Sequence, residues 1–369
     1  MQCPEVHLVG EGMTQSLRWR GQGNRREVLR AAMGWGALVL SAARVRQALG
    51  GPVPPTNGVA TGTAGSVKPA SDAVADAVRA GRELIGDPHF QRGFHVCRPN
   101  PGRHDRYGVL AGFESGSPAW DLVQWSSRES LAVQPSTDDG SRRTWANACK
   151  SLSLGRGPRA VSDTELVLAV NGWEEYGERA RRDGEPWVHL LVEQAFSDPP
   201  AISALESVRF RIAVQLIRSR LRRTLDYSTG RHAAQFQVFL TLQNQNRASG
   251  GFGRFLWFGI PLYDDRHRFP LAHKTQDTAG SGMFIFTPAG ETFSRASAHD
   301  GDWVSVNSEL LPLMREALET AWRQGYLTES RRLEDYRITG MNLGWEVPGI
   351  LDVSMSVREL SLMVVPRSA

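Results

Sequence analysis

Hydrophobic and polar residues alternate along many short segments of this chain, which is the pattern of half-buried β-strands. In Phe236–Asn246, the residues Phe236, Val238, Leu240 and Leu242 fall on one side of an extended chain, whereas glutamines occupy most of the other side. Turn-forming Gly, Pro, Asn and Asp separate the segments. The predicted strands are Leu122–Trp125, Lys150–Leu154, Leu166–Val170, Pro186–Phe196, Val208–Leu216, Gln235–Gln243, Phe255–Pro261, Gly282–Thr287, Gly340–Val347 and Leu351–Leu362.

Two segments have helical rather than alternating spacing. From Leu310 to Trp322 the apolar residues recur every three or four positions, Asn307, Ser308 and Glu309 are expected to cap the start, and a glycine follows the end. A shorter helix is expected over Ser71–Ile85. Short strands at this spacing predict an all-β fold, a β-sandwich or jelly roll with one or two flanking helices, over residues 71–369.

The amino-terminal residues 1–43 have the features of an export signal. The sequence NRREVLR at residues 24–30 precedes the apolar stretch Ala31–Ala43, which is too short to cross a bilayer permanently. It resembles a twin-arginine signal, although Asn24, Val28 and Arg30 stand where Ser or Thr, Phe and Lys are usual. No cysteine follows the apolar stretch, so we expect a periplasmic or secreted protein without a membrane anchor. Residues 44–70 are expected to form a flexible linker between the signal and the folded domain.

The charge distribution argues against nucleic-acid binding. The net charge of +4 comes from residues 1–50, which hold seven arginines and three glutamates, and the rest of the 369-residue chain is neutral. The 11 tryptophans suit both tight β cores and sugar stacking, so they raise a carbohydrate hypothesis. Once the signal is removed, Cys97 and Cys149 remain, and the sequence leaves open whether they form a disulfide or stay free thiols.

The strands Pro186–Phe196, Gln235–Gln243 and Gly340–Val347 each pair an apolar side with a side of amide, imidazole, carboxylate or aromatic groups. If they are neighbours in one curved sheet, these polar sides line a concave groove. Sugars require such a mixture, because amides and carboxylates bind hydroxyl groups while indole rings stack on C–H faces. The predicted substrate-binding residues are Trp187, His189, Gln235, Gln237, Trp257, Asp264, Asp265 and Asn342.

Glu193 and Glu346 are the candidate catalytic pair for cleavage of a glycosidic bond. That reaction needs one protonated carboxylic acid and one carboxylate, separated by roughly 5–5.5 Å for retention or roughly 6.5–9.5 Å for inversion of configuration. His189 lies on the same predicted face as Glu193 and could orient a substrate hydroxyl or shift a carboxyl pKa.

A second polar cluster follows the strand Phe255–Pro261. Asp264, Asp265 and Asp277 could act in acid/base catalysis, bind a structural calcium ion, or form an Asp–Arg network. Two histidines in the same segment match no strong metal motif. The sequence lacks a nucleophile elbow, a zinc-protease helix, a phosphate-binding loop and paired C-x-x-C motifs, so we expect neither a cofactor nor a catalytic metal.

The segments Leu84–Gly93 and Leu351–Leu360 resemble the first and last strands of carbohydrate-active jelly rolls. The resemblance implies a sandwich fold and a glycan ligand, and it carries over no catalytic residues. Three functions follow: an exported glycoside hydrolase, a polysaccharide lyase, or a non-catalytic carbohydrate-binding envelope protein. The length of the chain favours the hydrolase, since a lone binding module needs fewer residues.

Overall fold

The computed structural model describes residues 81–156, 164–278 and 280–368. The predicted signal and linker, and most of the helix predicted over Ser71–Ile85, lie outside the described residues. The last part of that helix prediction is wrong, because Arg82 and Glu83 form a short strand, β1, that pairs with the C-terminal strand of the chain.

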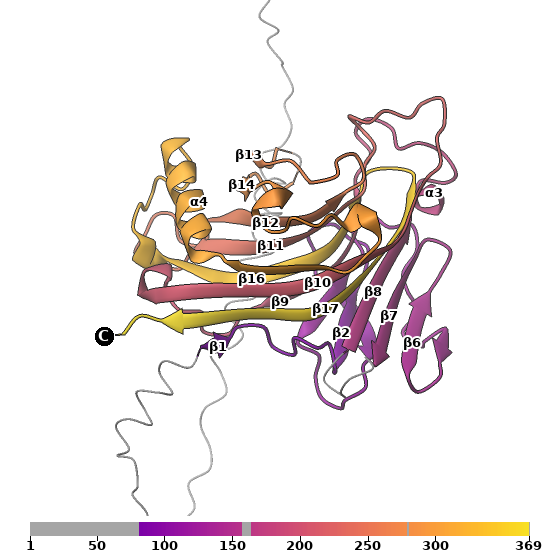
Figure 1. Ribbon diagram of the computed structural model, residues 1–369, viewed down its shortest axis with the longest axis horizontal. Coiled ribbons are helices and arrows are strands. Elements are labelled where there is room, and N and C mark those ends of the chain that lie inside the picture. Colours follow the sequence, from indigo (N-terminus) through magenta and orange to yellow (C-terminus); the bar gives the residue numbers. More distant parts are fainter. Residues whose placement is uncertain (1–80, 157–163, 279, 369) are drawn as a thin grey trace, which may run out of the picture. The chain divides into compact units, whose positions relative to one another are not determined.

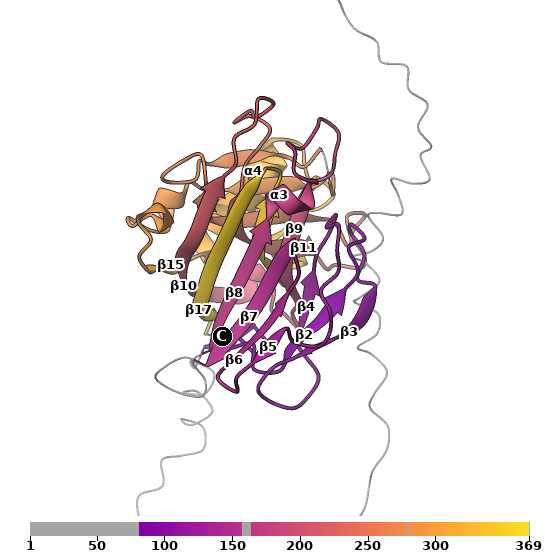
Figure 2. The same ribbon diagram turned by 90° about the vertical axis from the view of Figure 1, so that its right-hand side faces the viewer.

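The described residues form two β-sheets, which Figures 1 and 2 show as two layers. Figure 2 places the eight-stranded sheet in front of the other. Its order is β15 (Val304–Glu309), β10 (Leu205–Leu221), β17 (Leu351–Pro366), β8 (Thr164–Asn171), β7 (Lys150–Arg156), β6 (Arg142–Ala146) and β5 (Thr137–Asp138), with β1 (Arg82–Glu83) beside β17.

The nine-stranded sheet carries the candidate site. Its order is β13 (His273–Gln276), β14 (Phe284–Thr287), β12 (Phe255–Asp264), β11 (Gln235–Asn244), β16 (Tyr336–Val347), β9 (Val188–Ala195), β4 (Trp120–Val123), β2 (Gly93–Cys97) and β3 (Arg106–Ala111). The helices within the described residues are α3 (Gly172–Glu175) and α4 (Leu311–Arg323), with 3-10 turns at Ile202–Ala204, Gly290–Thr292, Ala298–Asp300 and Leu333–Asp335.

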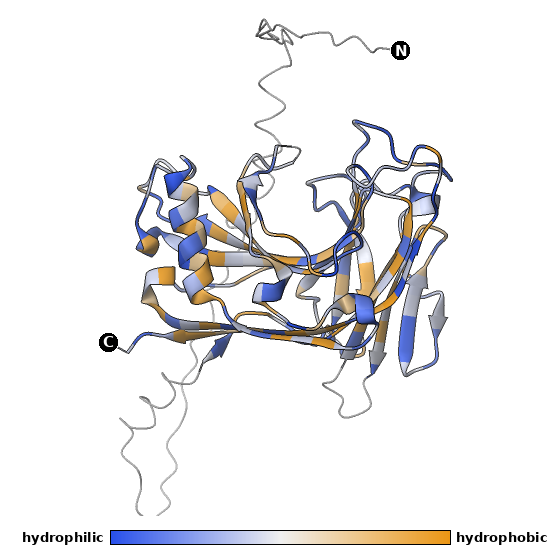
Figure 3. Ribbon diagram, turned by 45° about the horizontal axis from the view of Figure 1, so that its top comes forward, coloured by the Kyte–Doolittle hydropathy of each residue, from blue (hydrophilic) through white to orange (hydrophobic). Residues whose placement is uncertain are grey.

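Side chains of both sheets fill the space between them. Phe236, Val238, Leu240 and Leu242 of β11 are all fully buried in the main core, as the alternation predicts, and Figure 3 shows hydrophobic and hydrophilic residues alternating along the strands. Burying each such side chain contributes about 1.5–3 kcal/mol. Trp345 of β16 ties the layers together, because its indole Nε1 donates to the carbonyl of Leu168 in the opposite sheet at 2.9 Å.

The predicted all-β sandwich or jelly roll with flanking helices is therefore confirmed. Every predicted strand segment overlaps an observed strand, and β11, β16 and β9 are consecutive neighbours, as the groove hypothesis requires. Pattern analysis missed several strands, among them β2, β3 and β13. In β13 all residues are exposed and polar, so no apolar side marks it as a strand.

The start of α4 differs from the prediction. Asn307, Ser308 and Glu309 belong to strand β15, and the helix begins at Leu311 without a capping side chain at Leu310. Glu309 still satisfies a free backbone donor, since its carboxylate accepts a hydrogen bond from the Leu311 amide at 3.0 Å. Within the described ranges, no helix has the length and apolar character needed to span a membrane.

Candidate functional site

One face of the nine-stranded sheet points away from the main core and bears the predicted site residues. We call it the polar face. Strand register arranges its residues in three rows that run across the strands, about 7 Å apart because alternate residues share a face. The first row is Asp121, Glu193, Asn342 and Phe239; the second is Val123, Leu191, Gly344 and Gln237; the third is His189, Glu346, Gln235 and Asp264.

Glu193 and Glu346 lie on neighbouring strands but two rows apart. Glu193 is opposite Asn342, whereas Glu346 is opposite His189. Four residues along a strand and one strand across correspond to a Cα–Cα separation of about 14 Å. Between them lie Leu191 and Gly344, and Gly344 places no side chain there. A Cβ atom at Gly344 would approach the carbonyl oxygen of Leu190 to 2.2 Å, so the backbone allows only glycine.

Glu193 is enclosed in a network of charged groups. It is 3% exposed, and its Oε2 lies 2.7 Å from Nε2 of His104, which comes from the loop between β2 and β3. Asp121 is directly opposite on β4, and Arg106 holds it through two hydrogen bonds of 2.6 and 2.8 Å. Oε1 of Glu193 is buried and has no hydrogen-bond partner in the described part of the chain. The hydrogen-bonding capacity of this oxygen is therefore unused in the free protein.

The ionisation of Glu193 and His104 is coupled. Burial raises the pKa of Glu193, as does the charge of Asp121, while the hydrogen bond and charge of His104 oppose the rise. Burial lowers the pKa of His104, but the hydrogen bond and charge of Glu193 outweigh it, so the pKa of His104 is raised. The hydrogen bond thus stabilises a carboxylate on Glu193 next to an imidazolium on His104, against the effect of burial.

Glu346 has a less constrained environment. Its side chain is 17% exposed, and its Oε1 lies 4.0 Å from Nε2 of His189, too far for a direct hydrogen bond. Burial raises the pKa of Glu346; the charge of His189 and a hydrogen bond with Gln237 oppose the rise, and the charge of Asp277 adds to it. Burial thus favours the protonated acid at Glu346.

A backbone hydrogen bond sets the tautomer of His189. Its Nδ1 lies 3.0 Å from the carbonyl oxygen of Trp187, which can only accept, so Nδ1 carries the hydrogen. Nε2 is the ring nitrogen that faces Glu346. A substrate hydroxyl between these two groups would find hydrogen-bonding atoms on both sides.

The glutamines of β11 divide into two groups. Gln237 faces Glu346, as the groove hypothesis expects. Gln235 instead donates to Oδ2 of Asp264 at 2.8 Å, and Arg266 holds the same carboxylate through hydrogen bonds of 2.9 and 2.7 Å. Although burial raises the pKa of Asp264, the hydrogen bonds and charge of Arg266 lower it overall. This part of the cluster is the Asp–Arg network that the sequence left as an alternative.

Aromatic side chains lie at two places on the polar face. Trp257 makes edge contacts with Phe239 and Phe255, with ring centroids 5.8 and 4.9 Å apart, and its Nε1 donates to Ser281 at 2.9 Å. Near β9, the side chain of Trp187 is exposed and that of Trp125 is half-buried. Exposed rings beside carboxyl groups are suited to sugar stacking.

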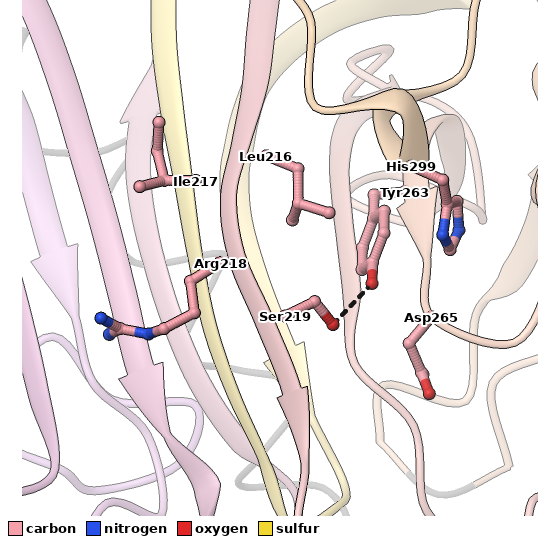
Figure 4. A pocket seen from close by; sticks show the side chains of 7 residues that line it. All are labelled: Leu216, Ile217, Arg218, Ser219, Tyr263, Asp265 and His299. Carbon is pink, nitrogen blue, oxygen red and sulfur yellow. Dashed lines mark hydrogen bonds between the residues drawn. The ribbon is translucent and has the colours of Figure 1, made fainter.

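Asp265 lies apart from the other predicted residues. Its Oδ1 accepts from the amide of Ala234 at 2.7 Å, and burial raises its pKa. It lines a separate hollow of about 290 Å³ between β10 and β12, beside Tyr263, whose hydroxyl donates to Ser219 at 2.8 Å (Figure 4). Because β10 belongs to the eight-stranded sheet, this hollow is not part of the polar face.

The described residues contain no group of three or more His, Cys, Asp or Glu side chains placed to hold a metal ion. The alternative in which Asp264, Asp265 and Asp277 together bind calcium has no such cluster to support it. Cys97 and Cys149 are both buried free thiols, which answers the question that the sequence left open. Burial raises their pKa to about 12 and about 11, so both resist forming thiolates.

Sequence reasoning did not identify His104, Asp121, Arg106 or Trp125. Asp121 gave only a weak signal, since it lies between the apolar residues Trp120 and Leu122 but shares its side of the strand with the apolar Val123. His104 was not, because it lies in a loop, and only the tertiary fold brings it to Glu193 across 89 positions of sequence.

No family model matches the sequence, and no curated protein matches it. Among solved structures, endoglucanase Cel12A from Rhodothermus marinus is 11% identical, covers 67% of this chain and 99% of its own, and has a TM-score of 0.35. A family 11 xylanase from Neocallimastix patriciarum is 10% identical over 63% and 94%, with a TM-score of 0.33. Endoglucanase 3 of family GH12 from Trichoderma harzianum is 8% identical over 69% and 100%, with a TM-score of 0.32. Because all these scores are below 0.5, the proposals below rest on the residues of this chain.

Proposed function

We propose that this protein is an exported glycoside hydrolase that cleaves a neutral polysaccharide or oligosaccharide on the polar face, with Glu346 as general acid and Glu193 as general base. One observation carries the proposal. Two glutamates with raised pKa values share one face of the sheet, and the strip of Leu191 and Gly344 between them bears no polar side chain. The carboxylate oxygen without a partner on Glu193 adds to it.

The two environments suggest how the roles divide. Burial favours the protonated form of Glu346, and no cation of the described residues lies within hydrogen-bonding distance of it, so it would donate its proton to the glycosidic oxygen as that bond breaks. Glu193 is paired with His104, which favours its carboxylate form, so it would take a proton from a water whose oxygen bonds to the anomeric carbon. Cα atoms about 14 Å apart favour the wide spacing of an inverting enzyme, roughly 6.5–9.5 Å between carboxyl groups, over the retaining one.

The charges on the polar face favour a hydrolase over a lyase. Lyases act on uronate polysaccharides, whose carboxylates need cations that are free to bind them. On this face Arg106 is paired with Asp121, and Arg266 is paired with Asp264. The carboxylates of Glu193 and Asp277 would repel a polyanion. A neutral glycan avoids this repulsion, and the aromatic rings supply its stacking partners.

The testing experiment incubates the full-length protein with a panel of neutral polysaccharides and uronate polysaccharides, and measures both retention on affinity gels and released products. Wild type, Glu346→Gln, Glu193→Gln and the control Glu206→Gln are compared; Glu206 is exposed on β10 in the other sheet. We expect products from a neutral glycan with wild type and the control, and retention without products for both site variants. Products from uronate polysaccharides alone would replace the hydrolase by a lyase.

The alternative of a non-catalytic binding protein has one structural argument in its favour, since Glu193 is almost fully enclosed. In that case wild type would be retained by a glycan and release no product from any member of the panel. Export is proposed from the twin-arginine pattern at residues 24–30. Fractionation of the producing cells checks it, with Arg25→Lys and Arg26→Lys together expected to retain the protein in the cytoplasm.

A further inference from the structure

Trp125 stands between the two halves of the candidate site. Its ring meets the ring of His104 at a centroid distance of 6.2 Å and an interplanar angle of 81°. It meets the ring of His189 at 6.0 Å and 65°. His104 holds Glu193, and His189 faces Glu346. A single indole ring therefore touches the imidazole partner of each glutamate.

Trp125 is also fixed to the backbone around it. Its Nε1 donates to the carbonyl of Arg103 at 3.3 Å, in the loop that carries His104, and its own carbonyl accepts from the His189 amide at 3.0 Å. The next residue, Ser126, has a φ of 59° and donates its amide to Pro99 at 3.0 Å. A non-glycine residue in the left-handed region costs energy and persists where its surroundings enforce it.

Beneath the ring lies a small apolar cluster that is separate from the main core. Its buried members are Cys97, Val123 and Leu191, with Trp125 packed against them. Leu191 belongs to the middle row between the two glutamates, so Trp125 packs on the strip that separates the two candidate catalytic residues. Packing on this cluster and the hydrogen bonds to the backbone together hold the indole in a defined position.

We propose that Trp125 is a positioning residue that braces His104 and His189 together, so that one ring sets the orientation of both glutamates. The expected effect of Trp125 on catalysis rests on the proposed function. The packing of Trp125 against both histidines is a property of the free protein and does not. Loss of the ring would remove a shared packing partner from both imidazoles at once, and each would keep only its own hydrogen bond, to Glu193 or to the Trp187 carbonyl.

The test compares Trp125→Ala, Trp125→Phe and the control Trp303→Ala by NMR of the imidazole nitrogens in the free, full-length protein. Trp303 is half-buried beside β15 and stacks under Arg358. His104→Gln and His189→Gln assign the two signals. We expect Trp125→Ala to shift the nitrogens of both histidines toward solvent-averaged values, and Trp125→Phe and the control to keep the wild-type pattern. A change at one histidine or at neither overturns the proposal. If Trp125→Ala does not fold, Trp125→Leu is read by the same criterion.

A kinetic arm separates this inference from the proposed function. With a glycan that wild type cleaves, Trp125→Ala should lower kcat about 10-fold or more with little change in KM, and Trp125→Phe should restore kcat to within about 3-fold. A kcat unchanged in Trp125→Ala would overturn the positioning role while leaving the hydrolase intact. If wild type cleaves no glycan, the proposed function fails and the NMR comparison still decides whether Trp125 braces both histidines.

Discussion

The two ends of the polar face hold their glutamates in opposite ways. At the β4–β9 end, Glu193 is 3% exposed and lies among paired charges, with His104 on one oxygen and the Asp121–Arg106 pair beside it. At the β11–β16 end, Glu346 has a 17% exposed side chain near neutral amides and an imidazole 4.0 Å away. Burial raises the pKa of both glutamates, but Glu193 has a hydrogen-bonded imidazole that opposes the rise, whereas the imidazole near Glu346 is too far away for a direct hydrogen bond.

This comparison shows that strand alternation determines on which face of the sheet a glutamate lies. Contacts made by loops then influence which protonation state of that glutamate is favoured. Both glutamates follow from the same two-residue period. What separates them is His104, which a loop brings to Glu193, and the absence of such a group within hydrogen-bonding distance of Glu346 in the described residues. A pair with different environments is what acid/base chemistry on a glycan needs.

The largest expected effects come from removing each carboxyl group in turn. Glu346→Gln and Glu193→Gln should each lower kcat by about 10³-fold, within the range for general acid or base groups. Activity should decline with rising pH as Glu346 loses its proton, and with falling pH as Glu193 gains one. The residual activity of Glu346→Gln should no longer decline as pH rises. The residual activity of Glu193→Gln should no longer decline as pH falls. If Glu346→Gln instead lost the decline at low pH and Glu193→Gln the decline at high pH, the roles of acid and base would be reversed.

Breaking the charged end should reduce stability. His104→Gln leaves Glu193 buried without its cation, which should cost about 3 kcal/mol of unfolding free energy at pH 6. Because the pKa of His104 is raised, its contribution is fully present below its unfolded value of 6.5 and is lost as pH rises through the folded value. Urea unfolding at pH 6 and pH 9 checks this, with exposed His273→Gln as control. An equal loss at both pH values would contradict the ion pair.

The glycine between the two ends can be tested by adding one methyl group. Gly344→Ala should cost about 2–4 kcal/mol, because Gly344 has a φ of 150° and the new Cβ would meet the Leu190 carbonyl at 2.2 Å. Gly250→Ala is the control, since nothing lies within 4 Å of the added atom there. Chemical denaturation of both variants measures the difference, and similar stability would mean that the strands have room to separate.

The smallest expected effect is a change in Tm when the carboxyl group of Glu346 is replaced. Burial raises the pKa of Glu346 above its ordinary value of 4.5, so folding favours the protonated form, and stability is lost as pH rises from 4.5 through the folded value. Glu346→Gln removes this penalty and should raise Tm by about 1–3 °C at pH 8 but not at pH 4. Thermal melts at the two pH values test this, and a lower Tm at pH 8 would show that the carboxylate is stabilised in the folded protein.

The sequence predicted the sandwich and the shared face for a simple physical reason. A half-buried strand must repeat its apolar side every second residue, so the alternation alone identifies the core side of β11. Register was not visible, because alternation fixes the side of the sheet and not the partner residue. Thus Glu193 and Glu346 were placed on one face correctly, but their separation by two rows came only from strand pairing.

Contacts made by loops were also invisible in the sequence. His104 lies in a loop and shows no periodicity, and Trp125, although it ends a predicted strand, carries no local signal that connects it with His104 or His189. Asp264 was predicted both as a substrate-binding residue and as a possible member of an Asp–Arg network, and its carboxylate is engaged by Gln235 and Arg266 as the network prediction requires. Asn307 and Ser308 were predicted to cap α4, because Asn and Ser are common at helix starts. The same residue types also occur in edge strands, and here both residues belong to β15.

The anomeric configuration of the first product tests the central claim most directly, because it depends on how the two glutamates are spaced. Proton NMR of a fresh digest of the neutral glycan that wild type cleaves shows the configuration before mutarotation. With Glu193 and Glu346 two rows apart, we predict inversion of the configuration at the cleaved bond, and loss of this product in Glu346→Gln. A retained configuration, or full activity in Glu346→Gln, would contradict the account.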